Sequence, residues 1–257
     1  MITLTSAQID AWLALLLWPF FRILAILSTD PFYSSRSIPI RVRVALAFML
    51  TLLLIPSLPT MPAVAPVSPM GILIGLQQII IGVAIGFTMR IVFTAVEMAG
   101  HIAGLQMGLG FASFYDPQHA SNVAVVAQVA SLLTLLLFLA LNGHLIMIET
   151  IAKSFVSLPI QAKPLAAAGF KAVVMWGGEI FRYGVLLSLP VVAALLITNL
   201  SIGVMAKAAP QLNIFAVGFP LTLTIGGAAM YFVFPGFVPH IQHLIDSANK
   251  MALRLFS

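Results

Sequence analysis

The chain has 257 residues, of which 61% are hydrophobic and only 7% are charged, whereas about a quarter of the residues in an ordinary soluble domain are charged. With a mean hydropathy of +1.11, the apolar side chains cannot all lie inside one water-facing core. The composition therefore excludes a soluble globular enzyme and indicates a protein of membranes or of a membrane complex.

The charged residues, the missing cysteine and the missing catalytic motifs exclude further classes of protein function. The net charge is +5, but the bases are scattered apart from Arg36, Arg41 and Arg43, so no nucleic acid is expected as a partner. The chain has no Cys, which removes disulfides and zinc–thiolate sites. HExxH, GxSxG and paired-carboxylate patterns are missing, so we expect no catalytic residue and no cofactor.

The N-terminal segment is expected to stay in the mature chain as a helix. No Lys or Arg precedes Arg22, so the basic start of a secretory signal is missing. Thr5 and Gln8 fit a capping box ahead of the apolar run that ends at Leu27, which predicts a helix start.

Further helices are predicted because Pro and Gly divide long uncharged stretches. Five prolines between Pro56 and Pro69 are too dense for a helix or a strand and predict an extended connector. The alternation typical of β-barrel strands is not found. The expected fold class is all-α, with helices over 11–29, 40–55, 70–104, 122–155, 170–206 and 212–234, followed by a tail.

The distribution of Lys and Arg tests a simple arrangement of six membrane spans, because short cytoplasmic loops are rich in these residues. If the spans alternate strictly in direction, several basic residues fall on the outer side, against this bias. They are Lys153, Lys163, Lys171, Lys250 and Arg254. The apolar run 44–55 is also short, at roughly 18 Å of helix against about 30 Å of hydrocarbon. Some helices are therefore expected to pack as hairpins against apolar partner subunits.

Glycines at four-residue spacing predict flat faces on one long helix, with the clearest strip at Gly100, Gly104 and Gly108. Backbones can approach closely over such a strip, so we interpret it as a subunit-packing surface. A phosphate-binding loop in 104–110 is the weaker alternative, because neither GxGxxG after a strand nor GxxxxGK[ST] occurs.

Ionisable groups in apolar segments are candidates for function, since a charge is costly there. Arg22, Arg90 and Glu97 are the predicted buried ionisable residues. Arg90 and Glu97 share a helix face two turns apart. A proton relay or ion pair is one interpretation, and pairing or snorkelling without a further function is the other. His144 follows Asn142-Gly143, which predicts a helix break.

Two histidines and an aspartate near the C-terminus suggest a metal site only superficially. His240, His243 and Asp246 lie at i, i+3 and i+6, but no fourth ligand is evident. An amphipathic tail helix explains their positions, because apolar residues form a stripe at 241, 244, 245, 248, 252 and 255. No metal is expected.

The most unusual segment is 106–122, which joins two apolar helices yet is rich in Gly and carries Phe111, Phe114 and Tyr115. Irregular backbone at membrane depth is tolerated only when it is buried in protein or lines a cavity. Aromatic side chains on such a linker would close a pore, and a surface loop with interfacial aromatics is the alternative.

Four stretches resemble one known family, and together they cover essentially the whole chain. They are WPFFRILAILSTDPFYSSRSIPIRVR at 18–43, GLQMGLGFASFYDP at 104–117, LFLALNGH at 137–144 and APQLNIFAVGFPLTLTIG at 209–226. They are similar to the FliR family, the R-type export-gate subunits of type III secretion. The FPLTLTIG ending resembles flagellar members rather than injectisome members.

The resemblance implies a non-enzymatic subunit of kinked helical hairpins. With P-type (FliP) and Q-type (FliQ) subunits it would form a gate for unfolded flagellar proteins. The implied regions are a P-like part at 1–180 and a Q-like hairpin with the amphipathic tail at 181–257. The implied pore plug lies in 106–122, at Met107, Phe111, Phe114, Tyr115 and Asp116.

Further partners implied by the resemblance are an FlhB-type switch protein, rod or adaptor proteins and membrane lipid. The implied location is the flagellar basal body at the bacterial inner membrane. Two other functions stay open. One is a small-solute transporter with Arg90 and Glu97 at a midplane site and helices broken around Pro190 and Pro220. The other is the corresponding subunit of a virulence-type injectisome.

Overall fold

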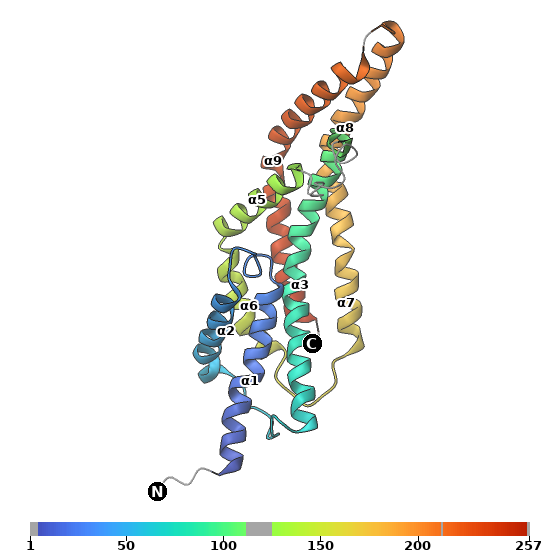
Figure 1. Cartoon of the computed structure of the whole chain (residues 1–257). Coiled ribbons are helices and arrows are strands. Elements are labelled where there is room, and N and C mark those ends of the chain that lie inside the picture. Colours follow the sequence, from blue (N-terminus) through green and yellow to red (C-terminus); the bar gives the residue numbers. More distant parts are fainter. Residues whose placement is uncertain (1–4, 112–124, 212, 256–257) are drawn as a thin grey trace. The chain divides into compact units, whose positions relative to one another are not determined.

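The computed structural model describes residues 5–111, 125–211 and 213–255. Within these residues the chain is helical and has no strand, so the all-α prediction is confirmed (Figure 1). The helices are α1 (Ser6–Thr29), α2 (Ile40–Leu54), α3 (Pro69–Gln106), α5 (Val125–Ala140), α6 (Gly143–Ser157), α7 (Ala167–Gly177), α8 (Glu179–Ala208) and α9 (Ile214–Arg254), with short 3-10 helices η1 (Ile55–Ser57) and η2 (Leu109–Phe111).

The start of α1 is the predicted capping box. The Thr5 hydroxyl accepts a hydrogen bond from the Gln8 backbone N–H at 3.4 Å, and the Gln8 side chain accepts one from the Thr5 N–H at 3.0 Å. These two bonds satisfy backbone donors that have no partner inside the helix. The helix start is therefore encoded locally.

Two predicted helices are divided in the structure. The predicted helix 122–155 contains α5 and α6, which are bent by 67° at their junction. Asn142 has a positive φ of 56° there, which confirms the predicted break. The predicted helix 170–206 is divided at Gly178 into α7 and α8.

The predicted helix 212–234 and its tail form one helix instead of two elements. α9 continues to Arg254 through Pro235 and Pro239, because the helical spacing of apolar residues continues past both prolines. The predicted stripe from 241 to 255 is buried. Pro190 and Pro220 also lie inside continuous helices, so the broken helices expected of a solute transporter are not found at these prolines.

The chain divides into two compact units, each built from segments that are distant in sequence. The first unit comprises Met1–Ile91, Asn142–Gly177 and Ile245–Ser257, and the second comprises Val92–Leu141 and Gly178–Leu244. These units describe packing within the chain, whereas 1–180 and 181–257 are regions of resemblance to two other subunits. That division stays a prediction.

Close helix packing builds the first unit, in which α1 lies against α2 and α3. A Cβ atom at Gly82 of α3 would lie 2.5 Å from the Arg22 carbonyl oxygen and 2.7 Å from the Ala25 Cβ of α1, so only glycine permits this approach. The Trp18 indole donates a hydrogen bond to the Gly71 carbonyl at 3.2 Å. The polar end of this buried side chain is thereby satisfied.

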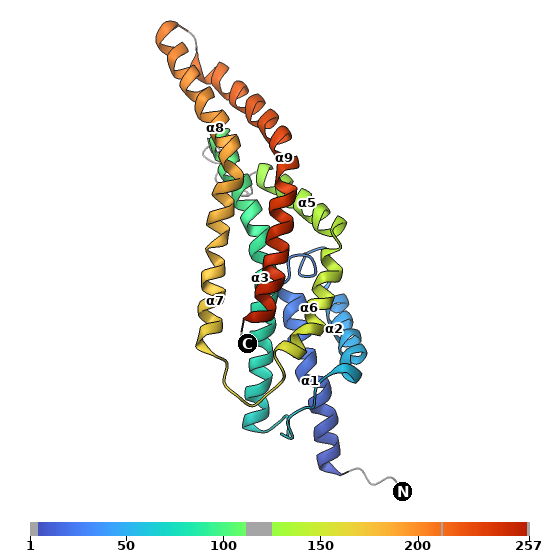
Figure 2. The same cartoon turned by 180° about the vertical axis from the view of Figure 1, so that it is seen from behind.

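The second unit contains the C-terminal part of α3, α5, and the hairpin formed by α8 and α9. Figure 2 shows these helices from behind. The Phe93 and Phe138 rings meet edge to face, with centroids 5.4 Å apart. A small core contains Ala103 and Met107 from the region of α3 together with Val191 and Leu195 from α8. This core lies where α3 ends.

Among the described residues, five helical segments are long and apolar enough to cross a membrane, or six if the bent pair of α5 and α6 forms one span. One of them is Ile40–Ser57, formed by α2 and η1, with 18 residues. Its length is roughly 27 Å, which is close to the roughly 30 Å hydrocarbon thickness of a bilayer. The segment includes Arg41 and Arg43, so the uncharged run 44–55 within it keeps the predicted length of roughly 18 Å.

Candidate functional site

The predicted plug segment is described only at its start. Phe114, Tyr115 and Asp116 lie outside the described residues, and for Phe111 the structure describes the backbone alone, in η2. Met107 is the plug residue whose surroundings are known. It follows the last residue of α3, Gln106, and its side chain is 3% exposed.

Met107 is anchored by α9 as well as by the small core. The Thr222 hydroxyl donates a hydrogen bond to the Met107 carbonyl at 3.1 Å. A Cβ atom at Gly226 would lie 2.6 Å from both Cε and Cγ of Met107, so the missing side chain at Gly226 makes room for the thioether. Sequence reasoning did not connect Thr222 and Gly226 with Met107, although both lie in the stretch 209–226 that carried the resemblance.

Gly108 ends α3 rather than extending its glycine strip. Its φ is 85°, in the left-handed region that glycine adopts at little cost and that commonly terminates helices. The chain then enters the single turn of η2. The backbone therefore changes direction directly after the Met107 anchor, at the start of the segment predicted to close a pore.

The other two glycines of the strip lie on the helix. Gly100 and Gly104 are buried, and a Cβ atom at Gly100 would lie 2.6 Å from the Ala127 Cα of α5. The face at Gly100 is thus already used for packing inside this chain. Contact of the strip with another subunit stays a prediction.

Arg22 is the one predicted ionisable residue that is buried within the chain, with 0% exposure. Its Nε donates to the Gln78 side-chain oxygen at 2.8 Å and its Nη2 donates to the same oxygen. Its Nη1 donates to the Ser154 carbonyl at 2.9 Å, and its guanidinium carbon lies 4.4 Å from the centroid of the Phe155 ring. Arg22 therefore joins α1, α3 and α6 through uncharged partners.

The other two predicted ionisable residues lie nearer the surface of the chain. Arg90 is exposed on α3, and Glu97 is half-buried, with an oxygen 4.0 Å from Nε2 of His101 one turn later. Neither residue is fully buried by the part of the chain that the structure describes, so a proton relay or ion pair between them stays a prediction.

A buried carboxylate organises the loop between α1 and α2. Oδ1 of Asp30 accepts hydrogen bonds from the backbone N–H groups of Phe32 and Tyr33 at 2.9 and 3.0 Å. Oδ2 of Asp30 is buried without a hydrogen-bond partner among the described residues. Burial raises the pKa of Asp30 to about 6, although the two backbone hydrogen bonds oppose the shift. Burial and the nearby Asp30 charge raise the pKa of Tyr33 to about 12.

The same loop is tied to neighbouring helices. The Tyr33 hydroxyl donates to the His144 carbonyl at 3.2 Å, and Nε of Arg43 donates to the Tyr33 carbonyl at 3.0 Å. Nδ1 of His144 is buried without a hydrogen-bond partner in the described part of the chain. These contacts place the start of α6 and the first turn of α2 beside the Asp30 loop.

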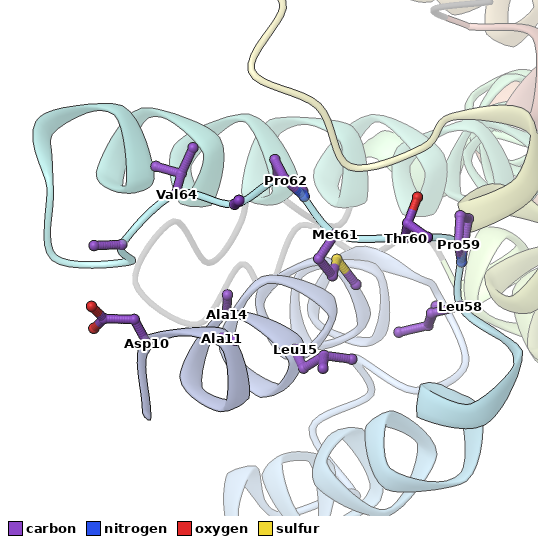
Figure 3. Close-up of a pocket in the computed structure, with 12 residues that line it drawn as sticks. Asp10, Ala11, Ala14, Leu15, Leu58, Pro59, Thr60, Met61, Pro62 and Val64 are labelled. Carbon is purple, nitrogen blue, oxygen red and sulfur yellow. The ribbon is translucent and has the colours of Figure 1, made fainter. Parts of the chain in front are cut away.

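A pocket of about 610 Å³ lies between the proline connector and α1. Figure 3 shows that its walls come from Leu58–Ala65 and from the α1 residues Asp10, Ala11, Ala14 and Leu15. Asp10 is the single charged group in this lining. The pocket offers an apolar surface with one carboxylate and lacks the paired acid and base that hydrolysis needs.

The C-terminal histidines take part in packing contacts. His243 lies 3.2 Å from the Tyr183 hydroxyl through Nδ1, and Nδ1 of His240 lies 3.0 Å from the Gly236 carbonyl one turn earlier. Among the described residues no group of three or more His, Asp or Glu side chains could hold a metal ion.

The apolar exterior and the long helices define an all-helical membrane protein. The chain belongs to the bacterial export proteins, family 1, which match it over residues 13–248. The resemblance noted in the sequence is thereby confirmed.

Within this family, the chain is similar to flagellar FliR proteins of several bacteria. The flagellar biosynthetic protein FliR of Escherichia coli strain K12 is 46% identical over 257 residues, which are 100% of this chain and 98% of that protein. FliR of Aquifex aeolicus is 31% identical and covers 84% of each chain. FliR of Bacillus subtilis strain 168 is 28% identical and covers 86% of this chain and 85% of its own length.

Proposed function

We propose that the chain is a non-enzymatic subunit of the flagellar protein export gate. It forms, with FliP-type and FliQ-type subunits, the channel through which unfolded flagellar proteins leave the cell. The observation that carries this proposal is the match to a family of bacterial export proteins over residues 13–248. Full-length similarity to flagellar FliR proteins favours the flagellar apparatus over an injectisome.

The segment 106–122 is the pore plug in this proposal. The arrangement around Met107 supports it, because a movable seal needs a fixed point of attachment. The Thr222 hydrogen bond and the space at Gly226 hold Met107 on α9, and Gly108 redirects the chain immediately afterwards. Aromatic side chains at 111, 114 and 115 can then close a pore by apolar contact and exclusion of water.

The proposed role as an export-gate subunit also implies further partners and a location in the cell. An FlhB-type switch protein and rod or adaptor proteins contact the assembled gate, which lies in the basal body at the inner membrane. The apolar exterior supports burial of this chain against lipid and against other apolar subunits.

A permeability measurement tests the plug and the assembly together. In cells that make the whole export apparatus, Phe111, Phe114 and Tyr115 are replaced together by Ala, and a second strain carries a deletion of 110–116. We expect increased uptake of a small dye in both strains, stronger for the deletion, while FliP-type and FliQ-type proteins still co-purify with the chain. A seal contributes little to folding, whereas truncating an aromatic residue in a packed core costs about 3–5 kcal/mol.

The matched control replaces Leu58, Met61 and Val64 of the proline connector by Ala. These three residues line the pocket beside α1, so their loss should not open the pore. If all strains have the same low permeability and only the aromatic variants lose co-purifying partners, the segment is structural core and the plug assignment is wrong.

A further inference from the structure

The outer face of α2 carries an apolar groove with a basic end. The groove has a volume of about 560 Å³ and is lined by Phe20 of α1 and by Ile40, Arg41, Val44, Ala45 and Phe48. Ile40 is 70% exposed, and Arg41 is exposed beside it. An amphipathic molecule with a long apolar part and an anionic head matches this arrangement.

The positive charge at this end is not neutralised by nearby sequence. Arg36, Arg41 and Arg43 lie within eight residues, and no Asp or Glu occurs between Asp30 and Glu97. Within the described residues Arg36 and Arg41 form no ion pair. Arg43 donates to the neutral carbonyl of Tyr33, which leaves its charge uncompensated as well.

Asp30 is the acidic residue that precedes these arginines in the sequence, but it cannot neutralise their charge at the surface. It is completely buried, and its Oδ1 is used by backbone N–H groups of the loop. A soluble anion alone would not use the apolar groove. A phospholipid would use both parts, with its acyl chain along α2 and its phosphate at Arg36 and Arg41.

A partner helix fits this face less well than lipid. Helices in membranes meet through small residues and interhelical hydrogen bonds, as α3 and α1 do at Gly82. α2 has no glycine, and its small residues Ala47 and Thr51 are buried inside the chain, where the Thr51 hydroxyl donates to the Ala47 carbonyl at 2.7 Å. The exposed Ala45 lies between the larger groove residues Ile40, Val44 and Phe48. The other exposed side chains of α2 include Phe48, Met49, Leu52 and Leu53, which are large and offer no hydrogen bond.

We propose that the groove between α1 and α2 binds an anionic phospholipid of the surrounding bilayer, with the acyl chain against Val44, Ala45 and Phe48 and the headgroup phosphate at Arg36 and Arg41. The uncharged run 44–55 gives roughly 18 Å of helix, which is enough to follow an acyl chain through one leaflet of about 15 Å, half of the hydrocarbon thickness. The basic end before residue 44 then lies at headgroup level. This inference does not depend on the export-gate assignment.

A local fluorescence experiment measures this preference. Because the chain has no cysteine, Met49→Cys provides a unique labelling position beside the groove. The labelled full-length chain is co-produced with FliP-type and FliQ-type proteins whose cysteines have been replaced, because the chain alone is expected to aggregate. The complex is reconstituted in phosphatidylcholine nanodiscs containing either brominated phosphatidylglycerol or brominated phosphatidylcholine. We expect the phosphatidylglycerol to quench the label at a roughly thirtyfold lower mole fraction, since each basic residue near an anionic headgroup strengthens binding by about fivefold.

Two pairs of variants decide whether the arginines cause the preference. Arg36→Gln with Arg41→Gln should remove it, whereas Arg36→Lys with Arg41→Lys should retain it because the charge is unchanged. The control Lys163→Gln with Lys171→Gln removes the same charge from another exposed region and should leave the preference intact. Equal quenching by the two lipids in the parent chain, or an unaltered preference in the Gln pair, would overturn the proposal.

Photocrosslinking in cells identifies the occupant without relying on either pair of variants. Phe48 is replaced by p-benzoyl-phenylalanine in the full chain, made together with the other export proteins, and the adduct is identified by its mass. A phospholipid adduct supports the inference. A protein adduct at this position would show that a partner subunit covers α2 and would contradict it, while leaving the export-gate proposal standing.

Discussion

Arg22 places a cation in an apolar interior, and its observed partners are all uncharged. Gln78 and Ser154 accept its hydrogen bonds, and Phe155 offers the face of its ring. Ser154 lies in the last turn of α6, which ends at Ser157, where the helix dipole is negative. A planar guanidinium can use all of these groups at once, which an ammonium cannot.

Arg22→Lys is therefore expected to destabilise the first unit although it keeps the charge. Losing part of a charged hydrogen-bond set should cost about 2–3 kcal/mol. The measurement, here and in the unfolding experiments below, uses the complex co-purified in detergent with FliP-type and FliQ-type proteins, because the isolated chain is expected to aggregate. The thermal unfolding of the parent and variant complexes is compared. The matched control is Arg41→Lys at an exposed position, and unfolding curves that coincide for both variants would contradict the expected role of Arg22.

Asp30 predicts a pH dependence of stability. Its pKa is raised by burial from 3.8 to about 6, so the folded chain binds this proton more tightly than the unfolded chain does. The stability contributed by that proton is complete below about pH 4 and is lost as the pH rises through about 6. A pKa difference of about two corresponds to roughly 3 kcal/mol. Asp30→Asn should remove this change, because the amide oxygen still accepts the two backbone hydrogen bonds.

The measurement for Asp30 is the free energy of unfolding in detergent at pH 4.5 and at pH 7.5. Asp246→Asn is the control, because Asp246 is exposed on α9 and its replacement should leave the pH dependence unchanged. The interpretation fails if Asp30→Asn has the same pH dependence as the parent chain.

At the scale of elements, glycine positions differ in what surrounds them. A Cβ atom at Gly100 would meet the backbone of Ala127 at 2.6 Å, whereas a Cβ atom at Gly203 of α8 would meet no described neighbour within 4 Å beyond its own helix backbone. A helix backbone can yield to a new methyl group only by moving the whole helix.

Gly100→Ala should therefore destabilise the contact between α3 and α5 by about 1–3 kcal/mol. Gly203→Ala should instead be neutral or slightly stabilising, since the methyl group favours the helix by about 1 kcal/mol relative to glycine. Thermal unfolding of the two variants in the same detergent tests this difference. Equal midpoints would mean that the backbone at Ala127 yields to the new methyl group without cost.

At the scale of the whole molecule, the exterior is more apolar than an isolated chain can sustain. Large apolar side chains that are more than half exposed occur on every described α-helix, among them Leu53, Leu136, Leu200 and Phe232. Surfaces of this kind are covered by lipid or by other proteins. Much of the outer surface is therefore expected to be covered in the assembled apparatus.

The chain produced alone should consequently aggregate or be degraded, and co-production with FliP-type and FliQ-type proteins should rescue it. Gel filtration in a mild detergent, with the chain detected by a tag, gives the measurement. A monodisperse and heat-resistant monomer obtained from the chain alone would contradict both this expectation and the need for partner subunits.

Local sequence determined the helix signals of this protein. The capping box at Thr5 and Gln8, the break at Asn142 and the buried stripe in the last helix were all predicted, because each depends on residues within a few helical turns. Composition determined the membrane class for a similar reason, since it requires no knowledge of which segments meet. The end of α9 was less well predicted, because a proline inside an apolar helix does not necessarily end it. The division between α7 and α8 at Gly178 was not predicted.

Only the tertiary structure decided what each site residue contacts. Arg22 is bound by Ser154, which is 132 positions away in the chain, and Met107 is held by Thr222, 115 positions away. Arg22 and Arg90 both lie in apolar segments, yet one is buried and the other exposed. The physical reason is that burial and hydrogen bonding depend on which distant helices pack together, and an apolar segment can present almost any face to its neighbours.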